Sequence, residues 1–413
     1  MLILKKTANI WIPILIILAL VGLTMINLRI EEQVALEDPF AIRWNAARSW
    51  MKEGWSPYSE ETQQAAQQLL KENNSLPNER ERGYFLDPAW YIYLFIPISF
   101  VPYPLAKAIW MTLSLASVIT SFFLALKLSG LKLTGLEVFI SSALGALFYP
   151  MIRASISASL LPFFIMLTLL AVQLALSGQG NLAGLLMLFA IWFNPVAIFV
   201  VVFLLVYLGS RRDNSFGQIL LVGFAFLMVI TLILFPGWIQ QWFTSLIRLG
   251  PGLEWLDTPL MGVARSFPGA YKQVAIGLHL FAFIMILVEW YGLGGRNERG
   301  VQWKLMLTLS MSYFFNPYSE GSFLLLVLPA FLIIFKYLSE KWPFSGKILF
   351  WISYLVVVFF SWRLLAGPIS GFPKEHVAIV LLLPILVFLG LQYFRWWAIA
   401  SPKALVESKN KLF

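Results

Sequence analysis

Hydrophobic residues in this 413-residue chain gather into a long series of apolar runs that short polar turns separate. A helix needs about 20 residues to cross a hydrocarbon core of about 30 Å, and many of the runs approach that length. They lie at 10–28, 104–128, 136–150, 155–177, 181–193, 195–209, 216–236, 273–291, 301–315, 320–336, 347–365 and 375–394. This pattern predicts an all-α integral membrane protein with about 12 transmembrane helices, which form a single polytopic domain over 1–413.

Two longer polar stretches, 29–88 and 237–272, interrupt the series, and the first of them holds 11 of the 21 acidic residues. Within it, 38–52 and 60–72 have the spacing of amphipathic helices. Asp38-Pro39 is a typical helix start, because an acidic N-cap precedes a proline at the first helical position. The aromatic side chains of the first helix suit the headgroup boundary, and both helices are therefore expected to lie on the membrane surface; these aromatic residues are Phe40, Trp44 and Trp50.

The distribution of lysine and arginine predicts the orientation, because basic residues concentrate in cytoplasmic loops. With the N-terminus inside, the cytoplasmic positions are Lys5, Lys6, Lys127, Lys132, Arg211, Arg212, Arg296, Arg299, Lys304, Lys336, Lys341, Lys347 and the basic tail 395–413. Segments 29–88 and 237–272 are then the two large extracytoplasmic loops, and 150–155 is a short external turn. This topology requires 88–102 to be re-entrant or interfacial and the helix to break at Asn194-Pro195. In the alternative topology, 88–102 crosses the membrane and 181–209 is one span.

The composition limits the partners and the kinds of site that this chain can have. Charged residues make up 12% of the chain, against about 25% in soluble domains. The net charge of +9 follows from the positive-inside rule, and no soluble domain carries it, so nucleic acid is not an expected partner. Without cysteine there is no disulfide or thiol nucleophile, and two histidines are too few for a histidine-rich metal centre. No metal or cofactor is therefore expected.

Three carboxylates lie where the apolar runs meet the external loops. Asp38, next to Glu37, opens the first loop, Asp87 closes it, and Glu320 stands at the outer start of a span. Each of them could simply cap a helix. An enclosed carboxylate at such a boundary could also act as a general base on a hydroxyl group.

Several other side chains on the same side could bind substrate. Arg153 and Arg265 offer the planar fork that matches phosphate oxygens, although each could instead anchor a headgroup. His279 lies about two turns into its span, where a titratable side chain suggests function, or else a contact with a neighbouring helix. Aromatic residues at the external rim, Trp44 and Tyr58 among them, could stack on sugar rings.

The order of these features resembles the polyprenol-phosphate-mannose-dependent mannosyltransferases, glycosyltransferase family 87 of the C superfamily of membrane glycosyltransferases. The matching motifs are Asp38-Pro39-Phe40, Trp44, Ala46-Ala47, Gly54-Trp55-Ser56-Pro57-Tyr58, Phe85-Leu86-Asp87-Pro88-Ala89, Ile96-Pro97, Val101-Pro102, Gly184 through Phe193-Asn194-Pro195, and Phe315-Asn316-Pro317-Tyr318-Ser319. The chain departs from the family pattern at Asp87, where tyrosine is usual, at Asn194, where lysine is usual, and at Glu320, where an aromatic residue or histidine is usual.

The resemblance implies an inverting transfer of mannose or another hexose from a polyprenyl-phosphate donor to a hydroxyl of a lipid or glycan acceptor. The reaction would take place on the extracytoplasmic face of the cell membrane. Asp38 would be the general base, and Arg265 or Arg153 would hold the leaving phosphate. Glu37, Trp44, Tyr58, Asp87, Asn194, His279, Asn316 and Glu320 would contribute to substrate binding. The enzyme is expected to be a monomer in contact with membrane lipids.

Two other functions remain open. A transporter or flippase for lipid-linked sugars would place charged groups near the middle of the membrane and show an internal repeat, and neither is evident in this sequence. An O-antigen-type polymerase or ligase would carry its large, arginine-rich external loop late in the chain. Here the larger loop comes first and is acidic.

Overall fold

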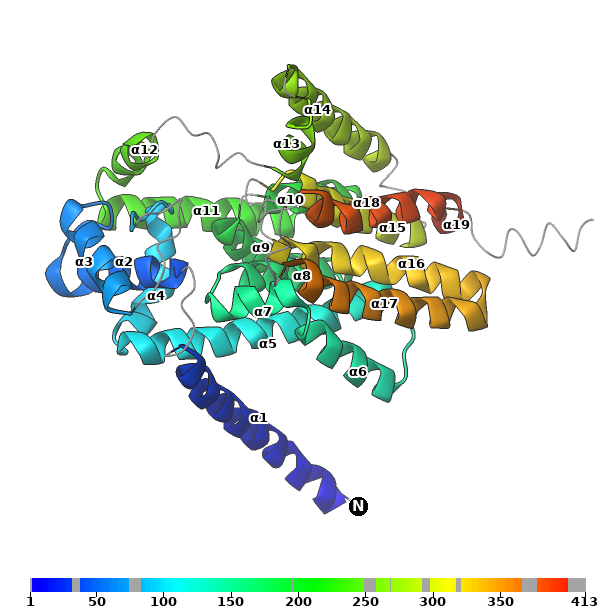
Figure 1. The fold of residues 1–413 in the computed structure, drawn as a ribbon, viewed down its shortest axis with the longest axis horizontal. Helices are drawn as coiled ribbons and strands as arrows, with labels where there is room; N and C mark the ends of the chain where they lie inside the picture. Colours follow the sequence, from blue (N-terminus) through cyan, green and yellow to red (C-terminus); the bar gives the residue numbers. More distant parts are fainter. Residues whose placement is uncertain are drawn as a thin grey trace, which may run out of the picture. The chain divides into compact units, whose positions relative to one another are not determined.

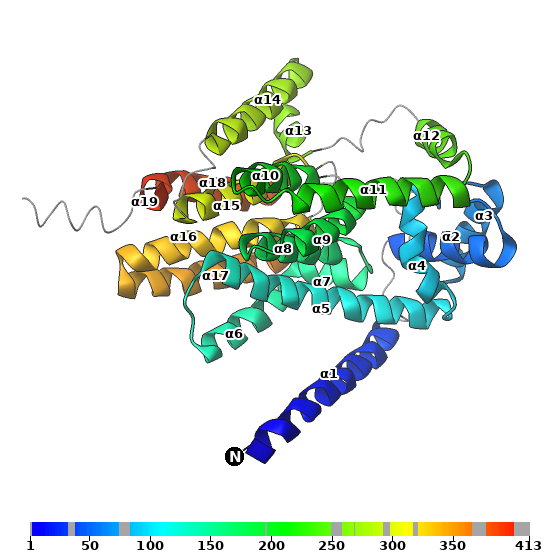
Figure 2. The ribbon, with the colours of Figure 1, turned by 180° about the vertical axis from the view of Figure 1, so that it is seen from behind.

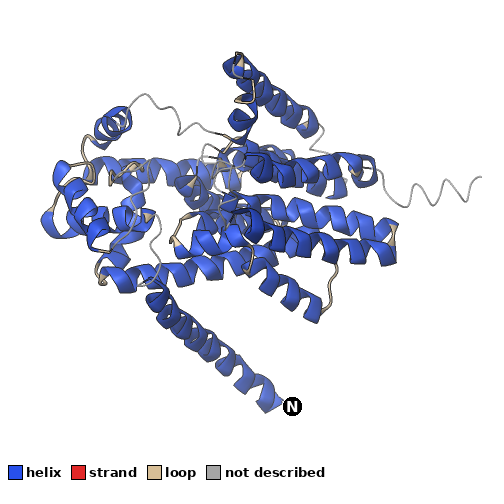
Figure 3. Cartoon of the chain, viewed as in Figure 1, coloured by secondary structure: helices blue, strands red, loops and turns tan. Residues whose placement is uncertain are grey.

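In the residues that this computed structural model describes, every regular element is a helix (Figures 1 and 3). The structure describes residues 2–31, 38–73, 83–194, 196–248, 258–267, 269–291, 298–316, 321–365 and 377–399. The predicted all-α class is confirmed for these ranges, in which no strand occurs. Length and apolar composition also make several of the helices able to cross a membrane, as predicted.

Among the described residues, six helices are long and apolar enough to span a bilayer: Pro13–Glu31, Tyr103–Ser129, Ser215–Leu234, Tyr271–Trp290, Phe323–Lys341 and Phe344–Arg363. A seventh span is formed if α6 (Gly135–Ala146) and α7 (Tyr149–Ile156) are taken together across their 60° bend. Other apolar helices are shorter: Ala89–Ser99, Leu161–Leu176, Gly180–Phe193, Ala197–Ser210 and Leu381–Tyr393. The number of twelve crossings therefore stays a prediction.

The helix boundaries correct the sequence pattern in one place. The expected external turn at 150–155 lies inside α7, and the chain instead bends between α6 and α7. Pro150 is tolerated there because it occupies the first turn of α7, where a missing N–H breaks no helical hydrogen bond. The break expected at Asn194 is present, since α9 (Gly180–Phe193) ends just before it and α10 (Ala197–Ser210) starts just after.

The chain divides into two compact units. The first unit comprises 1–117, 153–160 and 226–251. Its helices are α1 (Leu2–Glu31), α2 (Pro39–Glu53), α3 (Glu60–Glu72), η1 (Ala89–Tyr91), α4 (Ile92–Ser99), the first part of α5 (Tyr103–Ser129), the last part of α11 (Ser215–Leu234) and α12 (Trp238–Arg248). With η1, α4 covers 11 residues, a rise of only about 16 Å. The re-entrant or interfacial position of 88–102 stays a prediction.

The two helices predicted in the first loop are confirmed. α2 begins after Asp38, whose side chain accepts a hydrogen bond from the Ala41 backbone N–H, and it ends at Gly54 in the left-handed conformation (φ 70°). α3 starts at the N-cap Ser59. Asn45 of α2 donates to the carbonyl of Thr62, which fastens the two helices together.

The aromatic face of α2 does not lie at a headgroup boundary as expected. Phe40 and Trp44 are buried within the first unit, where Phe40 packs against Phe95 of α4 and Trp110 of α5. The reason is that α4 packs on this face of α2, a contact that the sequence pattern did not predict. Trp50 is half-buried against Phe235.

The second unit comprises 118–152, 161–225 and 252–413. Besides parts of α5, α7 and α11, its helices are α6, α8 (Leu161–Leu176), α9, α10, α13 (Pro259–Ala264), α14 (Tyr271–Trp290), α15 (Glu298–Phe314), η3 (Gly321–Val327), α16 (Leu328–Lys341), α17 (Pro343–Leu365), α18 (Val377–Tyr393) and α19 (Arg395–Ile399). α16 and α17 form a hairpin whose helices lie side by side in both views (Figures 1 and 2).

The core of the second unit is built around α15, which contacts α10, α14, α16, α18 and α19. Most of its residues are buried, including the polar Thr308, Ser310 and Ser312. Thr308 accepts a hydrogen bond from the Trp290 indole, so this polar side chain has a partner inside the core. The sequence of α15 is therefore less hydrophobic than those of the neighbouring helices, although more of its residues are buried in the protein.

Polar turns of many helices meet at one end of the second unit. Ion pairs join Glu289 to Arg395, Arg299 to Glu340, and Glu137 to Lys347. They connect turns that are far apart in the sequence, all of which the charge pattern assigned to the cytoplasmic side. The basic residues involved thus share one end of this unit, as a common membrane side requires.

Candidate functional site

Asp38, the predicted catalytic residue, is a buried carboxylate rather than an exposed helix cap. It is only 1% exposed, and its Oδ1 accepts the Ala41 N–H at 2.9 Å. Its Oδ2 accepts a hydrogen bond from the Tyr103 hydroxyl and lies 2.7 Å from the Lys107 ammonium. Asp38 therefore caps α2 and at the same time binds two side chains of α5.

Lys107 is the cation of this site, and it contacts two carboxylates. Its Nζ lies 2.7 Å from Asp38 Oδ2 and 3.5 Å from Glu31 Oε1, and the residue is 5% exposed. A lysine is almost never buried without a partner, because losing the hydration of its charge is costly. The Asp38–Lys107–Glu31 cluster thus joins the start of α2, the second turn of α5 and the end of α1.

Polar side chains hold the end of α1 at this position. Asn27 donates to the Thr112 hydroxyl at 2.9 Å, and the hydroxyls of Thr24 and Thr112 are 3.0 Å apart. Thr24, Asn27 and Glu31 are three or four residues apart, so they lie on one face of α1. The last turns of α1 therefore present a polar face to α5.

Aromatic rings enclose the cluster on the α2 side. Trp44 packs edge-on against Tyr103 with ring centroids 5.4 Å apart, and its indole donates to the carbonyl of Ile98 at 3.1 Å. Phe40 packs against Tyr103 as well. Trp44, predicted to bind substrate, is thus buried and holds α2 against α4. Its apolar surface lowers the local dielectric and so strengthens the ion pairs beside it.

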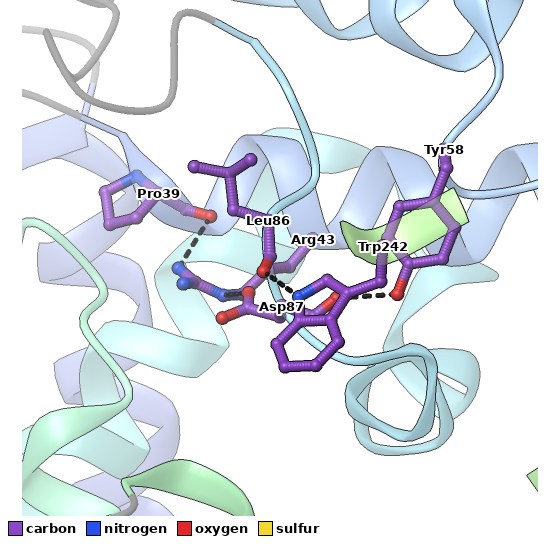
Figure 4. Close-up of polar contacts among 6 residues, drawn as sticks. All are labelled: Pro39, Arg43, Tyr58, Leu86, Asp87 and Trp242. Carbon is purple, nitrogen blue, oxygen red and sulfur yellow. Dashed lines mark hydrogen bonds and ion pairs between the residues drawn. The ribbon is translucent and has the colours of Figure 1, made fainter. Parts of the chain in front are cut away.

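Asp87, the second predicted carboxylate, is bound to α2 through Arg43 (Figure 4). Arg43 Nε lies 2.5 Å from Asp87 Oδ2, and the same guanidinium donates from Nη1 to the Pro39 carbonyl at 3.1 Å. The side chains of this pair are mostly buried. A cap on the following helix, one of the two interpretations of Asp87, is not present; the residue instead ties the end of the first loop to α2.

Two aromatic side chains complete this second cluster (Figure 4). Tyr58, predicted to bind sugar, donates from its hydroxyl to the Asp87 carbonyl at 2.8 Å, and Trp242 of α12 donates to the Leu86 carbonyl at 2.7 Å. Burial, followed by the charge of Asp87, raises the pKa of the Tyr58 hydroxyl. Tyr58 is therefore a neutral donor at physiological pH, and its position is set by the backbone of 86–87.

The remaining predicted residues lie elsewhere in the two units or outside the described residues. Arg153 is exposed on α7, and Arg265 is exposed at the end of α13 in the second unit. Asn194 and Asn316 are buried in the second unit, where Asn194 Oδ1 accepts the Val196 N–H at 2.8 Å just before α10 begins. Glu37 and Glu320 lie outside the described residues.

His279 has a structural partner at each ring nitrogen. Nδ1 donates to the Ala275 carbonyl at 2.7 Å, and Nε2 forms a hydrogen bond with the Thr258 hydroxyl at 2.8 Å. Thr258 is itself the N-cap of α13. The ring also lines an open apolar cavity of about 430 Å³ with Met261 and Phe283. The contact with a neighbouring element, one of the two interpretations of the sequence, is thus present.

The sequence pattern missed four side chains of the first unit that contact the predicted carboxylates: Glu31, Arg43, Tyr103 and Lys107. A usable signal existed for Lys107, because a lysine in the second turn of an apolar helix needs a buried partner. The other three carried no such signal, since Glu31 and Tyr103 are ordinary residues at the ends of spans and Arg43 is an ordinary residue in a polar loop helix. Within the described ranges, no group of acidic and histidine side chains is arranged to hold a metal ion.

No protein-family model matches this chain, and no curated protein matches it. The class of the protein therefore follows from its fold alone: an all-helical chain with several helices able to span a membrane. What the site can do follows from its side chains. A buried carboxylate could accept a proton, and a neighbouring lysine could stabilise a second anion.

Proposed function

We propose that this chain is an inverting, polyprenyl-phosphate-sugar-dependent hexosyltransferase of the cell membrane, with Asp38 as its general base. Mannose or another hexose would pass to a hydroxyl group of a lipid or glycan acceptor on the extracytoplasmic face. The observation that carries the proposal is the burial of the Asp38 carboxylate beside Lys107 and aromatic rings. Titratable side chains in such surroundings concentrate at functional sites.

The proposed reaction is a single displacement at the anomeric carbon. The acceptor oxygen forms a bond to this carbon while the bond from the carbon to the phosphate oxygen breaks. The phosphate leaves with the electron pair, and Asp38 takes the proton of the acceptor hydroxyl. Attack opposite the leaving group inverts the anomeric configuration, and a general base of this kind contributes about 10²- to 10⁴-fold to the rate.

The proposed topology is that of a C-superfamily glycosyltransferase with twelve crossings. The six long helices and the bent pair α6–α7, which are long and apolar enough to cross, would supply seven of them. The shorter helices α8, α9, α10 and α18, together with α15, would supply the other five. A helix shorter than the bilayer can cross where neighbouring protein or local thinning of the bilayer compensates.

The test is transfer of a radiolabelled sugar from decaprenyl-phosphate mannose to a lipid extract, with the purified protein in lipid nanodiscs. Asp38→Asn keeps the cap on α2 but removes the base, so turnover should fall by about 10²- to 10⁴-fold. Asp213→Asn is the matched control, because Asp213 also caps a chain turn, with Oδ1 accepting the Ser215 N–H. Equal activity of the two variants would exclude Asp38 as the base.

A further inference from the structure

Both oxygens of the Asp38 carboxylate already hold donors in this structure. Oδ1 binds the Ala41 N–H, and Oδ2 binds the Tyr103 hydroxyl and the Lys107 ammonium. A general base must come within about 2.6–3.2 Å of the proton that it removes. In a side chain that is 1% exposed, an acceptor hydroxyl can reach Oδ2 only if one of these donors gives way.

Lys107 is the donor that can leave. The Ala41 N–H is fixed in the backbone of α2, and the Tyr103 ring is held between Phe40 and Trp44. The lysine ammonium instead ends a flexible four-carbon stem. It also has a second carboxylate, Glu31, at 3.5 Å, so it need not lose all of its charge compensation when it moves away from Asp38.

We propose that the phosphate group of the lipid donor draws Lys107 off Asp38, so that donor binding releases the base. This inference rests on the proposed function. A phosphate ester carries charge and several acceptor oxygens, and it therefore competes well with one carboxylate for an ammonium group.

Two consequences follow from this exchange. Before the donor binds, Lys107 occupies the carboxylate oxygen that the acceptor hydroxyl needs, and the donor therefore binds first. After it binds, Lys107 faces the phosphate, where negative charge develops as the bond to the sugar breaks. One lysine thereby protects the site from unproductive chemistry and stabilises the leaving group.

The experiment measures binding of decaprenyl phosphate, the leaving group of the proposed reaction, to the full-length protein in nanodiscs. Decaprenol tests whether the phosphate is needed, and inorganic phosphate tests whether the lipid is needed. Asp38→Asn removes the anion that competes for Lys107 while keeping the cap, and it should tighten decaprenyl phosphate binding by about threefold or more. Lys107→Arg should keep binding, and Lys107→Met should weaken it by at least about tenfold.

The outcomes separate this inference from the function on which it rests. If the parent protein binds decaprenyl phosphate no better than decaprenol, the polyprenyl-phosphate donor is wrong and the inference fails with it. If binding needs the phosphate but Asp38→Asn leaves it unchanged or weakens it, the exchange of Lys107 is wrong and the proposed function stands. Asp38→Asn and Lys107→Arg decide the matter even where Lys107→Met does not fold.

Discussion

Lys107 lies 2.7 Å from Asp38, and this contact joins the second turn of α5 to the residue that starts α2. The two residues are far apart in the sequence, and the loop between them includes α3 and α4. Since Glu31 at the end of α1 also contacts Lys107, one cation fixes the ends of three segments. The position of the first loop on the spans therefore depends on a buried ion pair, whose loss would leave charges without compensation.

Lys107→Met should destabilise the protein strongly. Removing one partner of a buried ion pair costs about 3–5 kcal/mol, because the remaining charge stays desolvated. Here two carboxylates, Asp38 and Glu31, would lose the same cation. Thermal unfolding in detergent measures the effect, with the exposed Lys52→Met as the control. The triple variant Lys107→Met, Asp38→Asn, Glu31→Gln should recover most of the lost stability. If Lys107→Met alone is as stable as Lys52→Met, Lys107 does not form the buried ion pairs.

Asp87→Asn should loosen the end of the first loop from α2. The Arg43–Asp87 pair is mostly buried, and we expect a loss of about 1–3 kcal/mol because the charge of Arg43 loses its partner. Tyr58→Phe should cost less, about 1 kcal/mol, since it removes one neutral hydrogen bond to a backbone carbonyl. Thermal unfolding of both variants checks the order. A larger loss for Tyr58→Phe would show that Asp87 is not what holds this loop.

His279→Gln should leave transfer activity within a few-fold of the parent. Glutamine can still accept from Thr258, and the ring is engaged in supporting the start of α13. His279→Phe cannot accept that hydrogen bond, and it should lower the unfolding temperature because the Thr258 hydroxyl loses its partner. Activity and unfolding are measured on the same preparations. Loss of activity in a stable His279→Gln variant would assign a direct role in the reaction to this histidine.

Sequence pattern predicted the local elements of this protein well, because the signals are local. Asp38-Pro39, Gly54 and Ser59 set the limits of α2 and α3 through capping chemistry that involves only adjacent residues. The break after Phe193 was predictable from proline in the same way. The bend between α6 and α7 was not predictable, because a proline that is tolerated in the first turn of a helix does not show at which residue that helix begins.

The partners of the site were much harder to predict than its location. Asp38 was recognisable from its place between a span and a loop, but its burial depends on α4 and α5 packing against α2. That packing also turned Phe40 and Trp44 inward, away from the membrane surface to which an amphipathic pattern assigned them. Hydrophobic periodicity shows which face of a helix is apolar, and it does not tell protein contact from lipid contact.

Gly184→Ala should destabilise the second unit although it adds a single methyl group. A Cβ atom at this position would lie 2.7 Å from the backbone carbonyl oxygen of Phe216, so α9 and α11 could not approach as closely. Overpacking of this kind costs about 1–3 kcal/mol. Gly209→Ala is the control, because no atom lies within 4 Å of its Cβ. Thermal unfolding that ranks the two variants as equal would contradict the close packing of these helices.

The proposed orientation predicts opposite accessibility for two single-cysteine variants of this cysteine-free chain. Gln64→Cys lies on α3 in the first loop, and it should react with a membrane-impermeant maleimide in intact cells. Ser177→Cys lies in the exposed turn between α8 and α9. This turn packs against the basic turn with Arg211 and Arg212, because a Cβ atom at Gly180 would contact Asp213. Because basic turns face the cytoplasm, Ser177→Cys should react only after the membrane is permeabilised. The reverse pattern would invert the orientation, and it would place Asp38 at the cytoplasmic face, where the proposed extracytoplasmic transfer could not occur.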